Sequence, residues 1–298
     1  MNQFITAVLT SLSSGAIYAL MSISLVLVWR STRVVNFAQA GQAVLTTFIG
    51  YEVTVRSGSY WIGLIAAVIS GAVVGAIIDR FFMRPIFKRV KSGPIVMIAP
   101  VVATLGLLGL IQAIIGFIWG FTYVSIEAPV STDGYNLFGT VVAFSPFNLM
   151  VLVAVTIAML LLTLLFQKTN IGLALRASAF SPEIARLSGI KVDAVRTLGW
   201  ALAGAAGGLA GMLYVPGSYL HPNAMDVLLV FGFIAAVIGG LDSLFGAVAG
   251  AMILGFAINF ATSYISYKLV FITAFALLIT VLLVKPNGIF SSSKGRKD

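Results

Sequence analysis

The stretch WIGLIAAVISGAVVGAII, residues 61–78, decides the fold class. It has no charged side chain and is long enough to cross the hydrocarbon core of a bilayer as a helix. Similar apolar runs recur along the 298 residues, and the whole chain is 60% hydrophobic and only 9% charged, with a mean hydropathy of +1.07. The sequence therefore predicts an all-α fold, a polytopic membrane helical bundle.

Nine hydrophobic segments are expected to form the spans, and they cover roughly 4–29, 36–53, 61–79, 94–118, 147–166, 199–215, 227–241, 244–263 and 268–284. The second segment is polar and the seventh is short, so either is a candidate for a broken or re-entrant helix, and we expect about 8–10 transmembrane helices. We predict a single transmembrane domain over residues 1–298, with a disordered tail at about 290–298.

The basic residues predict the orientation of the chain. Residues 1–29 contain no Lys or Arg, which argues against a cleavable signal peptide and favours a true first span that enters from outside. Alternating the loops from there puts 16 of the 18 basic residues inside, with only Arg56 and Lys268 outside. The positive-inside rule then predicts an external N-terminus and a cytoplasmic C-terminus. Asp79 and Arg80 are expected to form a solvated anchor at the inner membrane edge.

Several chemistries are excluded by composition and motif. The chain has no cysteine and one histidine, which rules out disulfides and thiolate metal sites and leaves no His-based metal site to predict. It has no Gly-Lys-Ser/Thr nucleotide loop, no Ser-His-Asp set and no paired carboxylates within the spans, so we do not expect an enzyme. The basic runs at 80–91 and 294–297 suit anionic headgroups better than nucleic acid.

Small residues repeat at a spacing of four in several apolar segments. In lipid, such small-xxx-small patterns let helix backbones approach closely. We predict helix packing for these glycines, and a sliding interface used in gating is the alternative. The pattern GFIWG at 116–120 is included, and the other candidate packing residues are Gly71, Gly75, Gly204, Gly208, Gly211, Gly246 and Gly250.

The segment VVNFAQAGQAVL, residues 34–45, places three amides in an apolar chain. Asn36, Gln39 and Gln42 recur every three residues, and so they cover one broad helical face. Two hypotheses stay open. The amides form interhelical hydrogen bonds, or they provide a neutral polar lining for a solute path. Asp242, at the break in GGLDSLFG, is a candidate cap for a helix start.

The segment SPEIARLSG, residues 181–189, has the signals of a short capped helix. Ser181 suits the N-cap, Pro182 the first helical position and Glu183 the positive end of the helix dipole, while Gly189 is a natural stop. Asp193 is expected to cap the next helix. The segment lies in a predicted cytoplasmic loop at about 167–198.

The exposed side of this short helix predicts contact with a partner. Ile184 and Leu187 are three residues apart and share a face, next to Arg186. The alternative is an amphipathic connector that lies on the lipid headgroups. A short helix held below the bilayer with two aliphatic side chains outward favours docking.

Four stretches carry a resemblance to a known family. They are GAIYALMSISLVLVW (15–29), VVNFAQ (34–39), IGLALRASAFSPEIARLSGIKVDAVRTLGWALAGAAGGLAGMLY (171–214) and FGFIAAVIGGLDSLFGAVAGAMILG (231–255). They span most of the chain and resemble the LivH/LivM permeases of branched-chain amino acid ABC importers, the LivH half more closely. After NFAQ, Ala40, Gly41 and Gln42 depart from the family's usual glycine-acidic run, so the solute specificity is expected to differ if this region touches solute.

The resemblance implies a permease subunit that moves branched-chain amino acids inward across a bacterial-type plasma membrane. It implies a second, LivM-like permease, two cytoplasmic ATPase subunits and an extracytoplasmic solute-binding protein. This chain would hold no cofactor, since ATP and Mg would bind the ATPases. The short helix would be the coupling helix that contacts an ATPase, with candidate residues Ser181, Pro182, Glu183, Ile184, Arg186, Leu187 and Gly189. For Asp242, the family resemblance implies a role as a hinge or as part of the solute path.

Alternatives remain within and outside this class. The same kind of importer permease could carry urea, short amides or other amino acids. An ion-coupled secondary carrier acting alone would need a charged residue at mid-membrane, and none stands at a predicted span centre. A non-transporting scaffold is a further alternative, although the amide stripe and the short helix argue against it.

Overall fold

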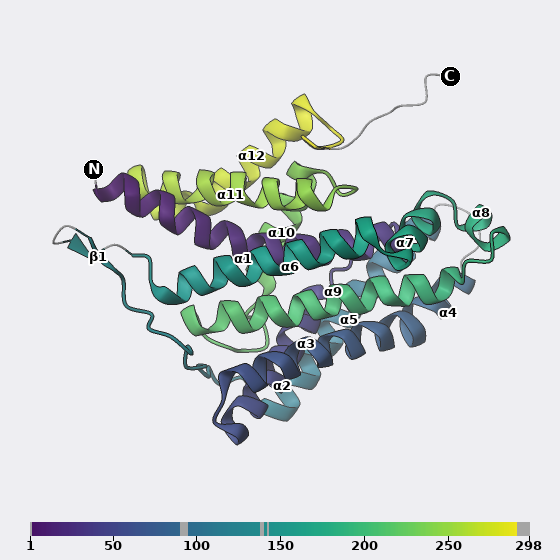
Figure 1. The fold of residues 1–298 in the computed structure, drawn as a ribbon, viewed down its shortest axis with the longest axis horizontal. Helices are drawn as coiled ribbons and strands as arrows, with labels where there is room; N and C mark the ends of the chain where they lie inside the picture. The colour runs from purple at the N-terminus through teal and green to yellow at the C-terminus, as the bar shows by residue number, and fades with distance from the viewer. Residues whose placement is uncertain (1, 90–94, 138–139, 142, 291–298) are drawn as a thin grey trace. The chain divides into compact units, whose positions relative to one another are not determined.

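The computed structural model describes residues 2–89, 95–137, 140–141 and 143–290 (Figure 1). The predicted all-α membrane bundle is confirmed, because each of the nine predicted segments overlaps one main helix. These helices are α1 (Asn2–Thr32), α2 (Gln39–Ser57), α3 (Tyr60–Ile77), α5 (Ile95–Trp119), α6 (Pro146–Lys168), α9 (Val192–Tyr214), α10 (Asp226–Gly239), α11 (Leu244–Tyr264) and α12 (Val270–Val284).

Shorter elements connect the long helices. They are the π-helix η1 (Ile78–Met83), α4 (Arg84–Arg89), the antiparallel strands β1 (Asn136–Leu137) and β2 (Thr140–Val141), α7 (Asn170–Phe180), α8 (Pro182–Leu187), and the 3₁₀ turns η2 (Val215–Gly217) and η3 (Tyr267–Leu269). The predicted tail at 290–298 lies outside the described residues from position 291 onward.

Seven helices in the described part of the chain are long and apolar enough to cross a membrane. Helices α2 and α10 are not among these seven, and they correspond to the polar and the short predicted segments. Helix α2 carries Gln39, Gln42 and Glu52, which lower its hydropathy. Helix α10 has 14 residues and rises about 21 Å, which is less than a hydrocarbon core of about 30 Å. Broken or re-entrant spans therefore stay a prediction for these two.

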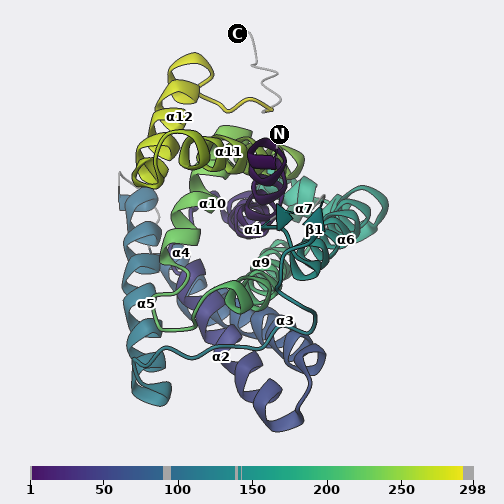
Figure 2. The same ribbon diagram turned by 90° about the vertical axis from the view of Figure 1, so that its left-hand side faces the viewer.

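The backbone groups into two compact units. Unit 1 comprises Met1–Val26, Ala128–Val155 and Val230–Asp298, and unit 2 comprises Leu27–Glu127 and Thr156–Leu229. Within unit 1, α10 and α11 touch through glycines, because a Cβ on Gly246 would meet the Gly239 carbonyl and one on Gly250 would meet the Ala235 carbonyl. Figure 2 shows α12 beside α11, and the two helices are in contact.

Unit 2 is built around the mutual contact of α2, α3 and α9. The closest approach is between α3 and α9, at a glycine seam that consists of Gly71, Gly75, Gly204 and Gly208. A Cβ on Gly71 would collide with the Gly204 carbonyl, and one on Gly75 would collide with the Trp200 carbonyl. Only glycine allows the backbones to lie this close, and dispersion contacts are the expected gain. Gly211 likewise lies against the Thr47 hydroxyl of α2.

The pattern GFIWG does not act in helix packing. Gly120 lies just after α5, has a φ of 78° and has no neighbouring atom within 4 Å of an added Cβ. Its role is a left-handed helix end, which the glycine backbone tolerates at little cost. The spacing of small residues alone was therefore misleading here, because one of the two glycines ends the helix.

Candidate functional site

Helix α8 forms where the sequence predicts it, as a short helix of six residues between α7 and α9 with a cap at each end (Figure 1). The Ser181 hydroxyl accepts a hydrogen bond from the Ile184 N–H at 3.4 Å, and Pro182 occupies the first helical position. Gly189 has a φ of 82°, and the Ile190 N–H donates to the Ala185 carbonyl at 3.0 Å. This closure is a Schellman motif, which fixes the end of α8.

The outer face of α8 is apolar and uncovered in this chain. Leu187 is 89% exposed and Ile184 is also exposed, while Ala185 is buried against the protein. Phe180, the last residue of α7 and the residue before the N-cap of α8, is 90% exposed and was not predicted as a contact residue. Its signal in the sequence was its position immediately before the N-cap, where the chain turns into α8. The carboxylate of Glu183 and the guanidinium of Arg186 are exposed on the same helix.

Asp193 does not cap α9, contrary to the prediction. Helix α9 begins at Val192, its N-cap is Lys191, and no side chain bonds to its first amides. Asp193 lies in the first turn, where a carboxylate still suits the helix dipole. Its Oδ1 is 3.8 Å from the Nη2 of Arg186 in α8, but both side chains are more than half exposed. Exposed pairs of this kind contribute at most about 1 kcal/mol.

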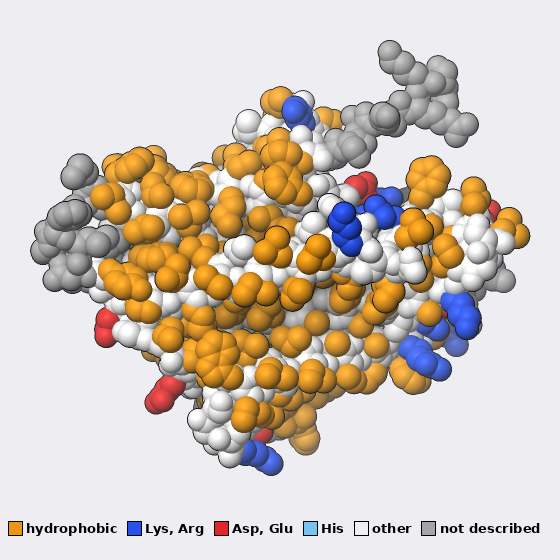
Figure 3. All heavy atoms as spheres, viewed as in Figure 1, with side chains coloured by type: hydrophobic (Ala, Val, Ile, Leu, Met, Phe, Trp, Pro, Cys, Tyr) orange, Lys and Arg blue, Asp and Glu red, His pale blue; other side chains and the backbone are white. Residues whose placement is uncertain are grey.

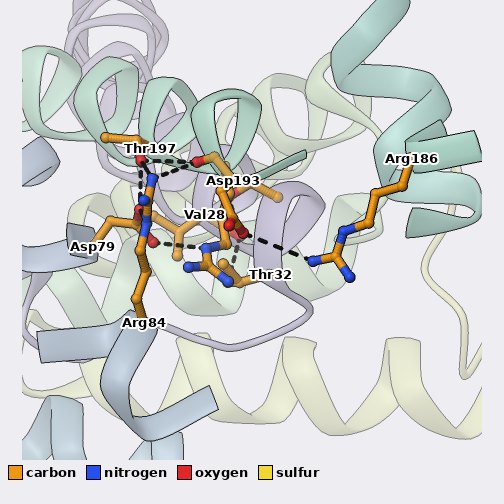
Figure 4. Close-up of polar contacts among 9 residues, drawn as sticks. Val28, Thr32, Asp79, Arg84, Arg186, Asp193 and Thr197 are labelled. Carbon is orange, nitrogen blue, oxygen red and sulfur yellow. Dashed lines mark hydrogen bonds and ion pairs between the residues drawn. The ribbon is translucent and has the colours of Figure 1, made fainter. Parts of the chain in front are cut away.

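Asp79 is the most buried charge among the described residues, and the prediction of a solvated anchor is wrong for it. Its Oδ1 accepts a hydrogen bond from the Arg196 Nε at 2.8 Å, and its Oδ2 accepts one from the Arg84 Nε at 3.1 Å. The Thr197 hydroxyl lies 2.6 Å from Oδ2 (Figure 4). We call Asp79, Arg84, Arg196 and Thr197 the Asp79 cluster.

The Asp79 cluster joins the end of α3 to the start of α9. Arg84 reaches across to α9, where its Nη2 donates to the Asp193 carbonyl at 2.6 Å and also to the Thr197 hydroxyl. The Arg196 guanidinium lies 5.2 Å from the centre of the Phe87 ring of α4. A buried carboxylate is tolerated only when paired in this way, so each arginine is required by the burial of Asp79.

The π-helix η1 explains why Asp79 and Arg84 meet. Residues five apart in an α-helix lie about 140° from each other around the axis, and so they do not share a face. The wider i→i+5 turn of a π-helix brings such residues nearly above one another. No sequence pattern indicated this turn, and the α9 partners lie more than 100 residues away from Asp79. Charge pattern alone therefore missed the cluster.

The three amides of the second segment are fully buried. Gln39 Nε2 donates to the Ala203 carbonyl of α9 at 3.0 Å, and Gln42 Nε2 donates to the Gly71 carbonyl of α3 at 3.3 Å. Asn36, in the break before α2, donates to Gln39 Oε1 at 3.1 Å. The amides thus join α2 to both helices of the glycine seam, in agreement with the interhelical hypothesis.

Two amide oxygens leave open the hypothesis that this segment provides a polar lining for a solute path. Asn36 Oδ1 and Gln42 Oε1 are buried and, among the described residues, have no hydrogen-bond donor. A buried carbonyl oxygen without a donor is uncommon and calls for a ligand, a water or a change of conformation.

Asp242 is exposed in the turn before α11, and Ser243, not Asp242, caps that helix through the Gly246 N–H at 2.9 Å.

Comparison with known proteins fits this architecture. The family model described as "Branched-chain amino acid transport system / permease component" matches residues 7–284. A Methanocaldococcus jannaschii protein named "Probable branched-chain amino acid transport permease protein LivH" is 31% identical, over 91% of this chain and 87% of that protein. The Salmonella typhimurium "High-affinity branched-chain amino acid transport system permease protein LivH" is 27% identical, over 99% and 97%.

A solved structure shares the fold. A chain in "PsaBC from Streptococcus pneumoniae in complex with Fab" superposes with a TM-score of 0.52 and 14% identity, over 96% of this chain and 93% of that one. At this identity the likeness concerns the fold alone. The family match covers nearly all the described helices, and so this chain belongs to the family of branched-chain amino acid transport permease components, as a multi-pass membrane transport subunit and not an enzyme.

Proposed function

We propose that this chain is the LivH-like permease of an ATP-driven importer for branched-chain amino acids. The observation that carries the proposal is the family match over residues 7–284, supported by the names of the relatives that align with nearly the whole chain. Unpaired amide oxygens at Asn36 and Gln42 support passage of a zwitterion, since neutral acceptors can meet an ammonium group without trapping it. A solute-path role for Asp242 stays a separate hypothesis, which rests on the family resemblance alone.

The proposed assembly includes a LivM-like permease, two ATPases that bind ATP and Mg, and an extracytoplasmic binding protein. The proposed orientation has the N-terminus outside and α8 inside, based on the distribution of Lys and Arg. Exposed apolar side chains at Phe180, Ile184 and Leu187 support docking of α8 on an ATPase. A fixed helix with a bare aliphatic face resembles other helix-in-groove contacts.

The proposed transmission runs from α8 through α9 to α3. The Schellman closure and the short connection at residues 188–191 place α8 directly before α9. The Asp79 cluster then holds the start of α9 to α3 and α4, and the glycine seam continues the same contact further along both helices. This favours movement of α3 and α9 as one body over sliding between them, because sliding would separate a buried carboxylate from its arginines.

The test is solute-dependent ATPase activity and uptake in proteoliposomes that hold the full set of subunits. We expect leucine-loaded binding protein to stimulate both ATP hydrolysis and leucine uptake, whereas binding protein presented with urea does not. Stimulation by urea alone would shift the solute class within the same kind of importer. Robust uptake by this chain alone without ATP would contradict the proposal and favour a secondary carrier.

A further inference from the structure

A groove of about 540 Å³ lies between α9 and the η1–α4 segment, in unit 2. Most of its lining consists of cationic and apolar side chains. Arg80, Arg84 and Lys191 provide the cations, and Ala194, Leu198 and Ala201 of α9 provide an apolar wall. Asp193 and Thr197 complete the lining. Arg84 and Thr197 also belong to the Asp79 cluster, whereas Arg80 and Lys191 lie outside it.

The cationic end of the groove carries more positive than negative charge. Arg80 and Lys191 are exposed, and in the part of the chain that the structure describes neither side chain forms a hydrogen bond or an ion pair. Asp79 does not line the groove, and Arg84 and Arg196 together outweigh its single charge. Asp193, the carboxylate in the lining, already has Arg186 at 3.8 Å. The groove therefore offers an excess of positive charge to an anion.

The apolar end continues into the membrane-spanning part of α9. Ala201 is ten residues beyond Lys191, which corresponds to about 15 Å along an α-helix. Leu198 and Ala201 are partly exposed within a helix that is long and apolar enough to cross a membrane. The wall is thus apolar and long enough to pack against part of an acyl chain.

The neighbouring face of α3 also suits lipid. Ile69, Val73 and Ile77 are exposed at a spacing of four residues, and Arg80 follows three residues later. Hydrophobic side chains cover most of the face of the molecule drawn in Figure 3. A stripe of bare aliphatic side chains that ends in an unpaired arginine matches the transition from acyl chains to headgroups.

We propose that this groove binds one anionic phospholipid. Its phosphate contacts Arg80, Arg84 and Lys191, and one acyl chain follows Leu198 and Ala201. Arginine suits phosphate because its planar fork can donate two parallel hydrogen bonds. An acidic protein segment would match the cations but not an apolar wall at membrane depth. Lipid binding in this groove does not depend on which solute the importer carries.

The main test is native mass spectrometry of the full chain titrated with phosphatidylglycerol or phosphatidylcholine. We expect a clear preference for phosphatidylglycerol, and an affinity loss of about 30-fold in Arg80→Gln/Lys191→Gln, since each basic residue near a membrane surface contributes about a factor of five. The matched control is Lys168→Gln/Arg176→Gln, which removes two exposed charges outside the groove and should leave the preference unchanged.

Equal losses in the two double variants would overturn the proposal, because they would mean general attraction of anionic lipid by net charge. A lack of preference in the unmodified chain would overturn it as well. Inorganic phosphate at the same concentration should not displace the lipid, since it lacks the apolar part. Displacement of the lipid by inorganic phosphate would mean that the groove binds anions without using its apolar wall, and it would contradict the proposal.

A second measurement keeps the charges intact and does not depend on the folding of the two charge variants. A photo-crosslinking residue in place of Leu198, in cells that produce the whole importer, should give an adduct with the mass of a phospholipid. An adduct with another polypeptide would assign the groove to a protein partner and overturn the lipid assignment.

Discussion

Two charged contacts lie next to each other at the start of α9, and they differ mainly in burial. In the Asp79 cluster the carboxylate is fully buried, and its two arginine side chains are 15% and 22% exposed. In the Arg186–Asp193 pair the side chains are 62% and 51% exposed, and the separation is 3.8 Å. The same chemistry therefore fixes the start of α9 strongly at the buried contact and contributes little at the exposed contact with α8.

The largest expected effect comes from Asp79→Asn. This change leaves Arg84 and Arg196 without their common countercharge in a buried position, and removing one partner of a buried pair typically costs about 3–5 kcal/mol. We expect the free energy of unfolding, measured by SDS titration in mixed micelles, to fall by that amount.

Asp193→Asn is the matched control, since it removes the exposed carboxylate a few residues away. We expect a loss of at most about 1 kcal/mol. Similar losses in the two variants would break the comparison, because burial would then not distinguish the two contacts.

The glycine seam allows a second test of the buried region. In Gly204→Ala the new Cβ would collide with the Gly71 carbonyl and crowd the Gln42 amide, so α3 and α9 must separate. Overpacking of this kind costs roughly 1–3 kcal/mol. Gly106→Ala in α5 is the control, since no atom outside its own turn lies within 4 Å of the added Cβ. It should be neutral or slightly stabilising, as alanine favours a helix.

Sequence patterns predicted what depends on nearby residues. The apolar runs located the long helices, and the order Ser181, Pro182, Gly189 located α8, because caps and turns are local chemistry. The Asp79 cluster was missed because it needs a π-helical turn and partners on a distant helix. Asp193 was misplaced for a related reason. A carboxylate in a first turn and one at an N-cap look alike in sequence, and they differ by two residues here.

The buried amides test whether the α2 contact is only structural. Gln42→Met keeps the approximate volume but removes the bond to the Gly71 carbonyl and the unpaired Oε1. We expect a stability loss of about 0.6 kcal/mol, typical of such bonds in membranes. We also expect leucine uptake in the assembled importer to fall several-fold. Uptake that matches the unmodified chain would limit Gln42 to helix packing.

The smallest effect on stability, and the sharpest contrast with Asp79, is expected for Glu183→Lys. Glu183 is exposed on α8, and surface changes of this kind usually alter stability by no more than about 0.5 kcal/mol. If α8 docks on an ATPase, the reversed charge should lower uptake per ATP hydrolysed, or weaken assembly, while membrane insertion stays normal. Glu127→Lys makes the same reversal at an exposed position in the predicted external loop and should leave coupling intact. Unchanged coupling in both variants would mean that Glu183 is not part of the contact. A loss of coupling confined to Glu183→Lys would show that exposed residues of α8 act through contact with a partner and not through the stability of the fold.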